Sequence, residues 1–311
     1  MGLVSLRRRT DGILLLEQTL IAGVQKVPEL PEVETVVRTL RRPLQGASIV
    51  GVRLGPRQLR RPWPVDRNFV FTTPRPVLGV YRRGKWIRCR LRGGWNLLFH
   101  LGMTGRLRVT DAEAALEPHT HLVFDLSPGN RQIRFQDIRR FGVADLLTDE
   151  ECEALLSGEQ LGPEPFDLTA EQLWQKARGS KRCLKAILMD QSVTAGVGNI
   201  YADEALFEAR LHPARLGITL RREEAQRLRN ALVSVLHRAI EVNGSTIRTF
   251  FFGEDGRGGY QNEFRVYHQT GKPCPRCGAV IRRLLVAGRS THFCPRCQPA
   301  PRRRARTGSH R

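Results

Sequence analysis

Four cysteines near the end of the chain stand in two Cys-x-x-Cys pairs, a spacing typical of metal sites. Cys274 and Cys277 form the first pair, Cys294 and Cys297 form the second, and sixteen residues separate them. Two such pairs supply four thiolates, which is the closed, tetrahedral ligand set of a structural Zn²⁺. Because no coordination position stays open, we expect one zinc ion that holds the local fold and takes no part in chemistry.

The segment between the two cysteine pairs has the pattern of a β-hairpin. Residues 279–285 and 291–293 can form its two strands. Arg282, Arg283 and Arg289 would make the hairpin basic, and a basic finger can contact nucleic acid. Arginines on a basic protein are usually just solvated, so the hairpin alone does not decide between these two interpretations.

The charge of the whole chain favours a polyanionic partner. The 311 residues include 51 Lys+Arg against 30 Asp+Glu, which leaves a formal charge of +21. Such a surplus repels itself unless a polyanion compensates it, so nucleic acid is the first expectation and an anionic membrane surface the second. Apolar residues make up 41% of the chain, which is enough for sizeable cores and excludes a disordered protein.

Several classes of protein are excluded by what the sequence lacks. The unbroken apolar runs are only a few residues long, so we expect no membrane-spanning helix. Seven cysteines are an odd number, which argues against a closed disulfide framework and favours a reducing cytosol. Residues 1–26 imitate a secretion signal, but Glu17 and Gln18 interrupt the apolar stretch and no small-residue cleavage site follows.

The hydrophobic pattern changes twice along the chain. A helix is expected from Pro31, because proline suits a first helical turn and Val33, Val36 and Leu40 recur at helical spacing. Short β-type runs follow without helices between them, which indicates an antiparallel sandwich or barrel. The β-type region extends from residue 47 to about 147. Examples of its runs are residues 48–54, 77–91, 96–100, 122–126 and 132–135, with a hairpin turn at 127–130.

The second half of the chain has a helical period. We expect helices at residues 168–178, 184–189, 200–209 and 220–242, the last of which stops at Asn243-Gly244. A glycine-rich loop at 253–259 and a short strand-like run to Tyr267 come next. The tail from Gln298 is rich in arginine and is expected to be disordered.

Six motifs, in this order, resemble those of bacterial formamidopyrimidine-DNA glycosylases, which remove oxidised purines from DNA. They are PELPEVET at 28–35, RRGK at 82–85, HLGMTG at 100–105, DIRRFG at 137–142, LGPEP at 161–165 and GVGNIY at 196–201. With the two cysteine pairs they span residues 28–297. A single motif would be weak, but six in the family's order are specific.

The resemblance implies an α+β multidomain fold. Its parts are an N-terminal antiparallel β-sandwich with flanking helices, a helical helix–two-turn–helix domain and a zinc-ribbon finger. The expected domains are a non-native or disordered extension at 1–27, the catalytic sandwich at 28–158, the helical DNA-binding domain at 159–265, the zinc finger at 266–298 and a basic disordered tail at 299–311.

The resemblance also implies a set of catalytic residues. In the family, the amine of an N-terminal proline attacks the sugar carbon that bears the damaged base, and the resulting iminium ion permits strand cleavage by elimination. Pro28 matches this nucleophile, and Glu29 matches the acid that protonates the sugar or the leaving base. Lys85 matches the lysine that holds a phosphate and assists β-elimination. Arg289 matches the finger arginine linked to δ-elimination.

A further set of residues matches the family's DNA contacts. A glycosylase must extrude its target base, and other groups must fill the vacated stack. Met103, Arg139 and Phe141 match the three void-filling residues, with Arg139 as the probe of the orphaned cytosine. The other matching contacts are His119, Lys181 and the phosphate-binding Asn199. Residues 253–260 resemble the loop that covers the flipped base.

Each of these residues has an ordinary structural explanation when it is considered alone. Met103 or Phe141 would more often belong to a core, and Lys85 or Lys181 would be a solvated charge. Glu29 would be a helix-start acid that the helix dipole favours. Only their joint placement in the family's order favours the functional interpretation.

The sequence departs from the family at the nucleophile. Pro28 lies inside the chain, where its nitrogen is a tertiary amide with a delocalised lone pair and cannot form an iminium ion. Val27 stands where the family has its initiator methionine, and a bacterial GTG start codon is read as valine when the start is assigned too far upstream. We therefore expect that residues 1–27 are not part of the native protein.

The sequence predicts a bifunctional DNA glycosylase and AP lyase. It would excise 8-oxoguanine and formamidopyrimidines from double-stranded DNA by β,δ-elimination, as a monomer in the bacterial cytoplasm. Two alternatives stay open: an endonuclease VIII-like glycosylase for oxidised pyrimidines, or a non-catalytic damage-binding protein if residues 1–27 persist.

Overall fold

The computed structural model describes residues 27–157, 160–245 and 256–300, which form two compact units. Residues 1–26 of the expected extension at 1–27, residues 301–311 of the expected tail and residues 253–255 of the glycine-rich loop lie outside these ranges. The tail was expected to be disordered from Gln298, but the Gln298 side chain is buried and donates to the Leu211 carbonyl at 2.9 Å. One unit comprises the chain to Asp167 with segments 190–198 and 233–263, and the other comprises 168–189, 199–232 and the chain from Phe264. No helix in the described ranges is long and apolar enough to cross a membrane.

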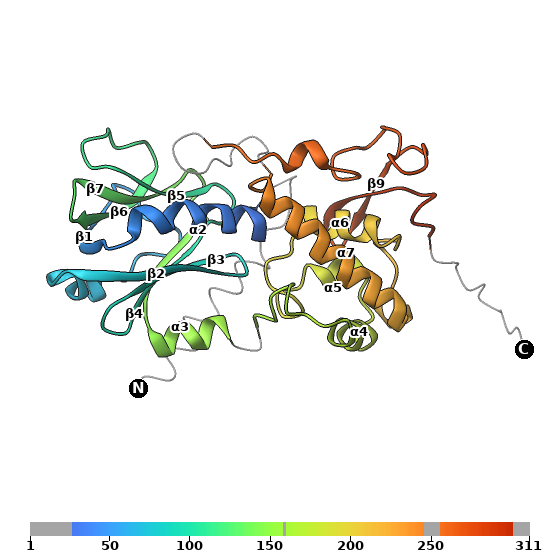
Figure 1. The fold of residues 1–311 in the computed structure, drawn as a ribbon, viewed down its shortest axis with the longest axis horizontal. Helices are drawn as coiled ribbons and strands as arrows, with labels where there is room; N and C mark the ends of the chain where they lie inside the picture. Colours follow the sequence, from blue (N-terminus) through green and yellow to red (C-terminus); the bar gives the residue numbers. More distant parts are fainter. Residues whose placement is uncertain (1–26, 158–159, 246–255, 301–311) are drawn as a thin grey trace, which may run out of the picture. The chain divides into compact units, whose positions relative to one another are not determined.

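The first unit is built on eight antiparallel strands (Figure 1). Their order across the sheet is β5-β7-β6-β1-β2-β3-β4-β8. Only two residue pairs join β1 to β2, so the sheet folds into two four-stranded layers, which confirms the predicted β-sandwich. The strands are β1 (Ser48–Leu54), β2 (Arg75–Arg83), β3 (Trp86–Leu91), β4 (Trp95–His100), β5 (Gly105–Asp111), β6 (Thr120–Ser127), β7 (Arg131–Asp137) and β8 (Val143–Thr148).

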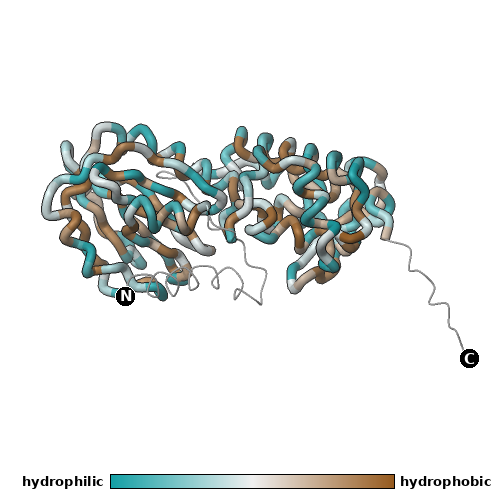
Figure 2. The backbone as a smooth tube through the Cα atoms, turned by 90° about the horizontal axis from the view of Figure 1, so that it is seen from below, coloured by the Kyte–Doolittle hydropathy of each residue, from teal (hydrophilic) through white to brown (hydrophobic). Residues whose placement is uncertain are grey.

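Helix α2 (Leu30–Leu44) shares the core of this sandwich. Proline occupies its first turn as predicted, and the apolar side chains at helical spacing are buried. Val33, Val37 and Leu40 pack in the same cluster as residues of both sheet layers, such as Phe99 and Phe124. Figure 2 shows hydrophobic stretches along the strands of this unit and hydrophilic stretches in its connections. The apolar face of α2 is therefore buried along the whole helix, which fixes the helix against the sandwich.

The structure of this unit differs from the expectations in three places. The run at 77–91 is two strands, because Gly84 adopts a φ of +56° and turns the chain between β2 and β3. Strands β5 and β8 were not predicted. The sequence also missed the 3₁₀ helix η1 (Val65–Thr72) and helix α3 (Asp149–Leu156), whose start is capped by the Thr148 hydroxyl and Glu151.

The second unit is helical and carries the zinc-finger hairpin. Its helices are α4 (Ala170–Arg178), α5 (Leu184–Leu188), α6 (Asn199–Glu208), the 3₁₀ helix η2 (Gly217–Thr219) and α7 (Arg222–Glu241), of which residues 222–232 belong to this unit. Each predicted helix is confirmed to within about two residues, and α7 ends at Glu241, shortly before Asn243 and Gly244, which both have positive φ. The predicted hairpin is β9 (Arg282–Val286) with β10 (Arg289–Phe293).

The predicted strand-like run to Tyr267 is wrong. The described part of this run contains the 3₁₀ helix η3 (Tyr260–Glu263), which belongs to the first unit, and no strand. The buried Glu204 carboxylate accepts the backbone N–H groups of residues 265, 266 and 267. These donors are therefore taken by a side chain on α6, and no ladder forms.

Candidate active site and DNA-contact residues

The first predicted catalytic pair lies at the start of α2. Pro28 is buried, and the Glu29 side chain is 3% exposed. The Glu29 carboxylate accepts the Gly198 N–H at 2.8 Å, and the Leu30 N–H donates to the Gly196 carbonyl at 3.0 Å. The loop at 190–198 therefore fixes both the backbone and the carboxylate beside Pro28.

Two glycines of the GVGN motif allow this close approach. A Cβ on Gly198 would lie 2.6 Å from Oε1 of Glu29, which leaves no room for a side chain. Gly196 has a φ of +89°, and a Cβ there would lie 2.8 Å from Cβ of Leu30. The motif residues matched from sequence thus have a physical role: their bare backbone seats the acid.

The same loop lies next to the turn that carries Lys85. A Cβ on Gly84 would be 3.4 Å from the backbone nitrogen of Gly196, and the Gly84 N–H donates to Glu164 at 2.6 Å. Lys85 follows directly and is half-buried. The structure therefore brings the turn that carries Lys85 and the Glu29 carboxylate to one loop.

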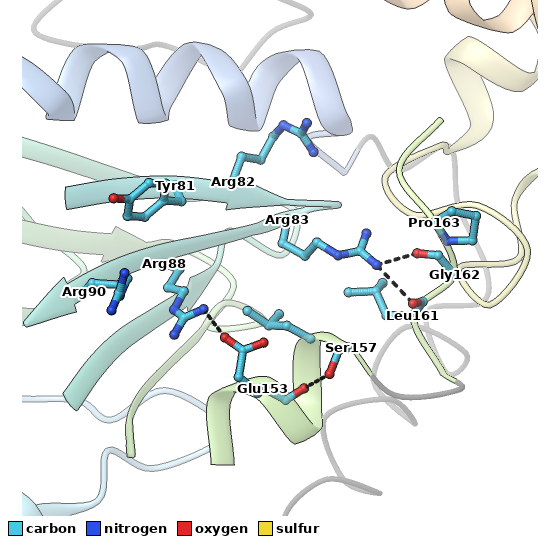
Figure 3. Close-up of a pocket in the computed structure, with 11 residues that line it drawn as sticks. Tyr81, Arg82, Arg83, Arg88, Arg90, Glu153, Ser157, Leu161, Gly162 and Pro163 are labelled. Carbon is cyan, nitrogen blue, oxygen red and sulfur yellow. Dashed lines mark hydrogen bonds and ion pairs between the residues drawn. The ribbon is translucent and has the colours of Figure 1, made fainter. Parts of the chain in front are cut away.

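Arginines behind the turn hold it in place. The Arg83 guanidinium donates to the carbonyl oxygens of Leu161 and Gly162 at 3.1 and 2.5 Å (Figure 3). Arg82 pairs with Glu164 at 2.7 Å. These contacts explain the residue types in the two motifs. The two arginines of RRGK bind backbone carbonyl groups and the glutamate of LGPEP.

A groove of about 670 Å³ borders the Arg83 anchor, and it contains none of the predicted site residues. Figure 3 shows Arg88 and Arg90 of β3 on its wall together with Tyr81 of β2 and Glu153 of α3. Arg88 is paired with Glu153 at 2.6 Å and is thereby engaged within the unit. This groove is therefore not the candidate site, although it is large.

The three predicted void-filling residues lie together. Nη1 of Arg139 is 3.6 Å from Sδ of Met103, and the Arg139 guanidinium lies over the Phe141 ring at 5.1 Å from its centroid. Met103 is buried, whereas Arg139 and Phe141 are half-buried. Two loops far apart in the sequence, after β4 and after β7, thus form one cluster, as the resemblance implies.

A buried aspartate holds the loop after β7. The Asp137 carboxylate accepts the backbone N–H groups of Arg139 at 3.1 Å and Gly142 at 2.6 Å, and the Thr104 hydroxyl. The Asp137 N–H donates to the His119 carbonyl at 3.0 Å. His119 is exposed and has a φ of +65°. Asp137 therefore connects the void-filling cluster to the backbone of His119.

In the second unit, Asn199 and the finger hairpin meet. Asn199 is the first residue of α6, and its amide donates to the Ser290 carbonyl at 3.2 Å. Ser290 directly follows Arg289, which is half-buried. Lys181 is exposed before α5, and within the described ranges its side chain has no hydrogen bond or ion pair.

A buried ionic network that the sequence analysis missed supports this arrangement. Nζ of Lys185 lies 2.7 Å from Asp203 and donates to the Ser290 carbonyl at 3.0 Å, and both charged side chains are fully buried. Asp203 also accepts the His292 N–H at 2.9 Å. Burial raises the pKa of the neighbouring Glu204, although three backbone N–H groups oppose the shift. The sequence signal that could have revealed this network is the presence of charged residues at buried positions of α6.

The four predicted zinc ligands converge. Their Sγ atoms all lie within 4.8 Å of one another, at 3.9 Å for Cys274–Cys297 and 3.5 Å for Cys277–Cys294. A tetrahedron with Zn–S bonds of about 2.3 Å has edges of about 3.8 Å, so the spacing fits one Zn²⁺.

The four thiols lie close enough to shift one another's pKa values. A hydrogen bond from the Ala279 N–H lowers the pKa of Cys277 to about 7, whereas burial and the neighbouring thiols raise that of Cys297 to about 12. Four thiolates at this distance need a cation, so one structural zinc is the cofactor.

Three family models together match most of the chain. The formamidopyrimidine-DNA glycosylase N-terminal domain matches residues 27–144, the H2TH domain of the same glycosylase matches 161–251, and a zinc finger found in FPG and IleRS matches 271–300. A formamidopyrimidine-DNA glycosylase of Desulforamulus reducens is 43% identical over 282 residues, covering 88% of this chain and 100% of that protein. The chain belongs to the formamidopyrimidine-DNA glycosylase family.

Solved structures of formamidopyrimidine-DNA glycosylases have the same fold. A Lactococcus lactis FPG mutant in complex with a Fapy-dG-containing DNA superimposes with a TM-score of 0.81 at 35% identity. A MutM structure in complex with carbocyclic 8-oxo-G-containing DNA gives 0.80 at 35% identity. Each covers 88% of this chain and 100% of the solved chain. These glycosylases confirm the predicted combination of sandwich, helical domain and zinc finger.

Proposed function

We propose that this protein is a bifunctional DNA glycosylase and AP lyase that excises oxidised purines, 8-oxoguanine and formamidopyrimidines, from double-stranded DNA. The observation that carries the proposal is the position of the Glu29 carboxylate. A buried carboxylate next to Pro28 is held by the Gly198 N–H, on the same loop that borders the turn of Lys85. A nucleophile, an acid and a phosphate-holding cation are the groups that base excision with strand cleavage requires.

Each group has one task in this reaction. The Pro28 amine attacks the sugar carbon and forms a bond to it as the base leaves, and Glu29 supplies a proton to the sugar or the leaving base. The amine then loses its proton, and the bond between this carbon and the ring oxygen opens as the oxygen takes a proton, which gives an iminium ion. The iminium ion acidifies the neighbouring sugar proton, whose loss expels the 3′ phosphate. Lys85 holds a phosphate during this β-elimination, and Arg289 of the finger assists the δ-elimination that follows.

The reaction requires that Pro28 be a free secondary amine. An α-amino group has a pKa of roughly 7.7–8.0, so about a tenth or more is unprotonated near pH 7. Within a longer chain the same nitrogen is an amide and has no nucleophilic lone pair. We infer that the active form begins at Pro28. The family match, which starts at residue 27, supports this inference.

The remaining predicted residues would bind DNA. Met103, Arg139 and Phe141 would fill the stack after base extrusion, with Arg139 facing the orphaned cytosine. His119, Lys181 and Asn199 would contact the backbone. The zinc on the four cysteines would hold the finger that carries Arg289. The protein would act as a monomer on DNA in the bacterial cytoplasm.

Excision assays on defined duplexes test this function. The form that begins at Pro28 should release 8-oxoguanine opposite cytosine and nick the strand, at rates above those for a duplex with an oxidised pyrimidine. The second substrate is a necessary comparison, because a Lactococcus lactis FPG has been solved with DNA that contains an oxidised pyrimidine. Faster release of the pyrimidine would favour the endonuclease VIII-like alternative, and binding without release would favour a damage-binding protein.

A further inference from the structure

A second arginine, which is not among the predicted site residues, lies over the Phe141 ring. The guanidinium carbon of Arg60 is 3.8 Å from the ring centroid, closer than the 5.1 Å of Arg139. Arg60 belongs to the segment between β1 and η1, far from Phe141 in the sequence. The backbone N–H of Arg60 also donates to the Arg140 carbonyl at 3.2 Å. A side-chain contact and a backbone contact therefore connect this segment to the loop that carries Phe141.

The loop after β7 needs such support. Arg140 has a φ of +61°, a left-handed conformation that costs energy for a residue with a side chain. Asp137 restrains the backbone on either side of it, at Arg139 and Gly142. The Arg60 N–H restrains the Arg140 carbonyl itself.

The Phe141 ring is only half-buried, so packing alone does not fix its orientation. A cation above an aromatic face is attracted by the ring's quadrupole, and the planar guanidinium adds stacking. Arg60 thus supplies part of the orientation that a fully buried ring would obtain from its neighbours.

We propose that Arg60 is a positioning residue for base extrusion, which holds the Phe141 ring ready to enter the stack. The inference rests on the proposed function, because it requires Phe141 to act as a void-filling residue. Arg60 acts through the ring and the Arg140 carbonyl. A direct contact of Arg60 with a DNA phosphate is the competing explanation, since its side chain is exposed.

A double-mutant cycle separates these two explanations. Base extrusion would be followed by stopped-flow fluorescence of 2-aminopurine placed next to 8-oxoguanine. The full chain and the chain that begins at Pro28 would both be tried, and the form that extrudes the base would be used. A cation–π contact at such a site corresponds to about two- to fivefold in an equilibrium constant. Arg60→Ala should reduce extrusion by that factor and leave cleavage of a pre-formed abasic site unchanged, and Arg60→Lys should restore part of the loss. In a Phe141→Ala background, Arg60→Ala should have no further effect.

Arg57→Ala is the matched control, because Arg57 is an exposed arginine three residues away in the same segment. It should extrude the base like the wild type. An equal loss in Arg57→Ala, or an Arg60→Ala effect that persists in the Phe141→Ala background, would overturn the positioning role and indicate a phosphate contact. A wild-type protein that extrudes no base would contradict the proposed function itself, so the two failures are distinguishable.

Discussion

The substitution Gly198→Ala tests whether the loop at 190–198 seats the catalytic acid. The new Cβ would lie 2.6 Å from Oε1 and 2.8 Å from Cγ of Glu29. Ordinary carbon contacts begin near about 3.5 Å, so the carboxylate must move by about 1 Å. The Glu29 side chain is buried and held by the Gly198 N–H, so it cannot move without weakening that hydrogen bond.

Two independent estimates of the effect agree. Misplacing a catalytic group by about 1 Å costs about 100-fold in rate. A hydrogen bond to a charged group contributes about 1.5–3 kcal/mol, which corresponds to roughly 10- to 150-fold. We therefore expect single-turnover release of 8-oxoguanine to fall by about 100-fold in Gly198→Ala.

The assay must compare two reactions, because the proposed reaction uses Glu29 to expel the base and depends on it much less for the later elimination. Cleavage of a pre-formed abasic site should therefore fall by less than about tenfold. Gly51→Ala is a suitable control, since its Cβ would make only an ordinary 3.6 Å contact with Asp125 in the same unit. If Gly198→Ala released 8-oxoguanine at the wild-type rate, or lost both reactions equally, Glu29 would not be the acid that this loop seats.

Three further predictions concern binding and stability. Removing zinc with a chelator should unfold the finger and abolish DNA binding, because so short a hairpin has little core of its own; binding that survives in metal-free protein would contradict this. DNA affinity should fall steeply with salt, and Lys85→Ala should weaken binding to all duplexes and reduce the salt slope by about one; an unchanged slope would exclude Lys85 from phosphate contact. Burial raises the pKa of Glu224, but hydrogen bonds from Arg215 and the Arg221 N–H outweigh it, so the net shift is downward. The contact between Glu224 and Arg215 therefore stabilises the fold above the ordinary glutamate pKa of about 4.3, and this stabilisation is lost as the pH falls. In thermal unfolding, Glu224→Gln should lower the free energy of unfolding by about 1 kcal/mol near pH 7 and by much less at low pH.

Features that depend on local spacing could be predicted from the sequence. The zinc ligands are two pairs at the two ends of a single hairpin, so their convergence follows from spacing alone. The helix from Pro31 follows from proline at the first turn and a regular apolar face. The separation of β-type runs and helical periods along the chain indicated an antiparallel sandwich or barrel followed by helices, and the resemblance supplied the rest of the fold class.

Features that depend on distant contacts could not be predicted in this way. The hydrogen bond from Gly198 to Glu29 joins residues 169 apart in sequence, and the motif match marked Gly198 without showing that its missing side chain makes room for an acid. Lys185 was overlooked because its partner Asp203 lies on another helix and neither has a local pattern. Arg60 is one of many arginines in a basic chain, and only the position of the Phe141 ring distinguishes it.

The proposed reaction requires that Pro28 be both the nucleophile and the first residue of the active form. Borohydride trapping on an 8-oxoguanine:cytosine duplex tests it most directly, with the uncleaved full chain compared with a chain that begins at Pro28. The short form should give a covalent protein–DNA adduct that maps to Pro28, and the full chain should give none, because an amide nitrogen cannot form an iminium ion. Equal trapping of the two forms would show that another amine attacks the sugar and would contradict the assignment of Pro28.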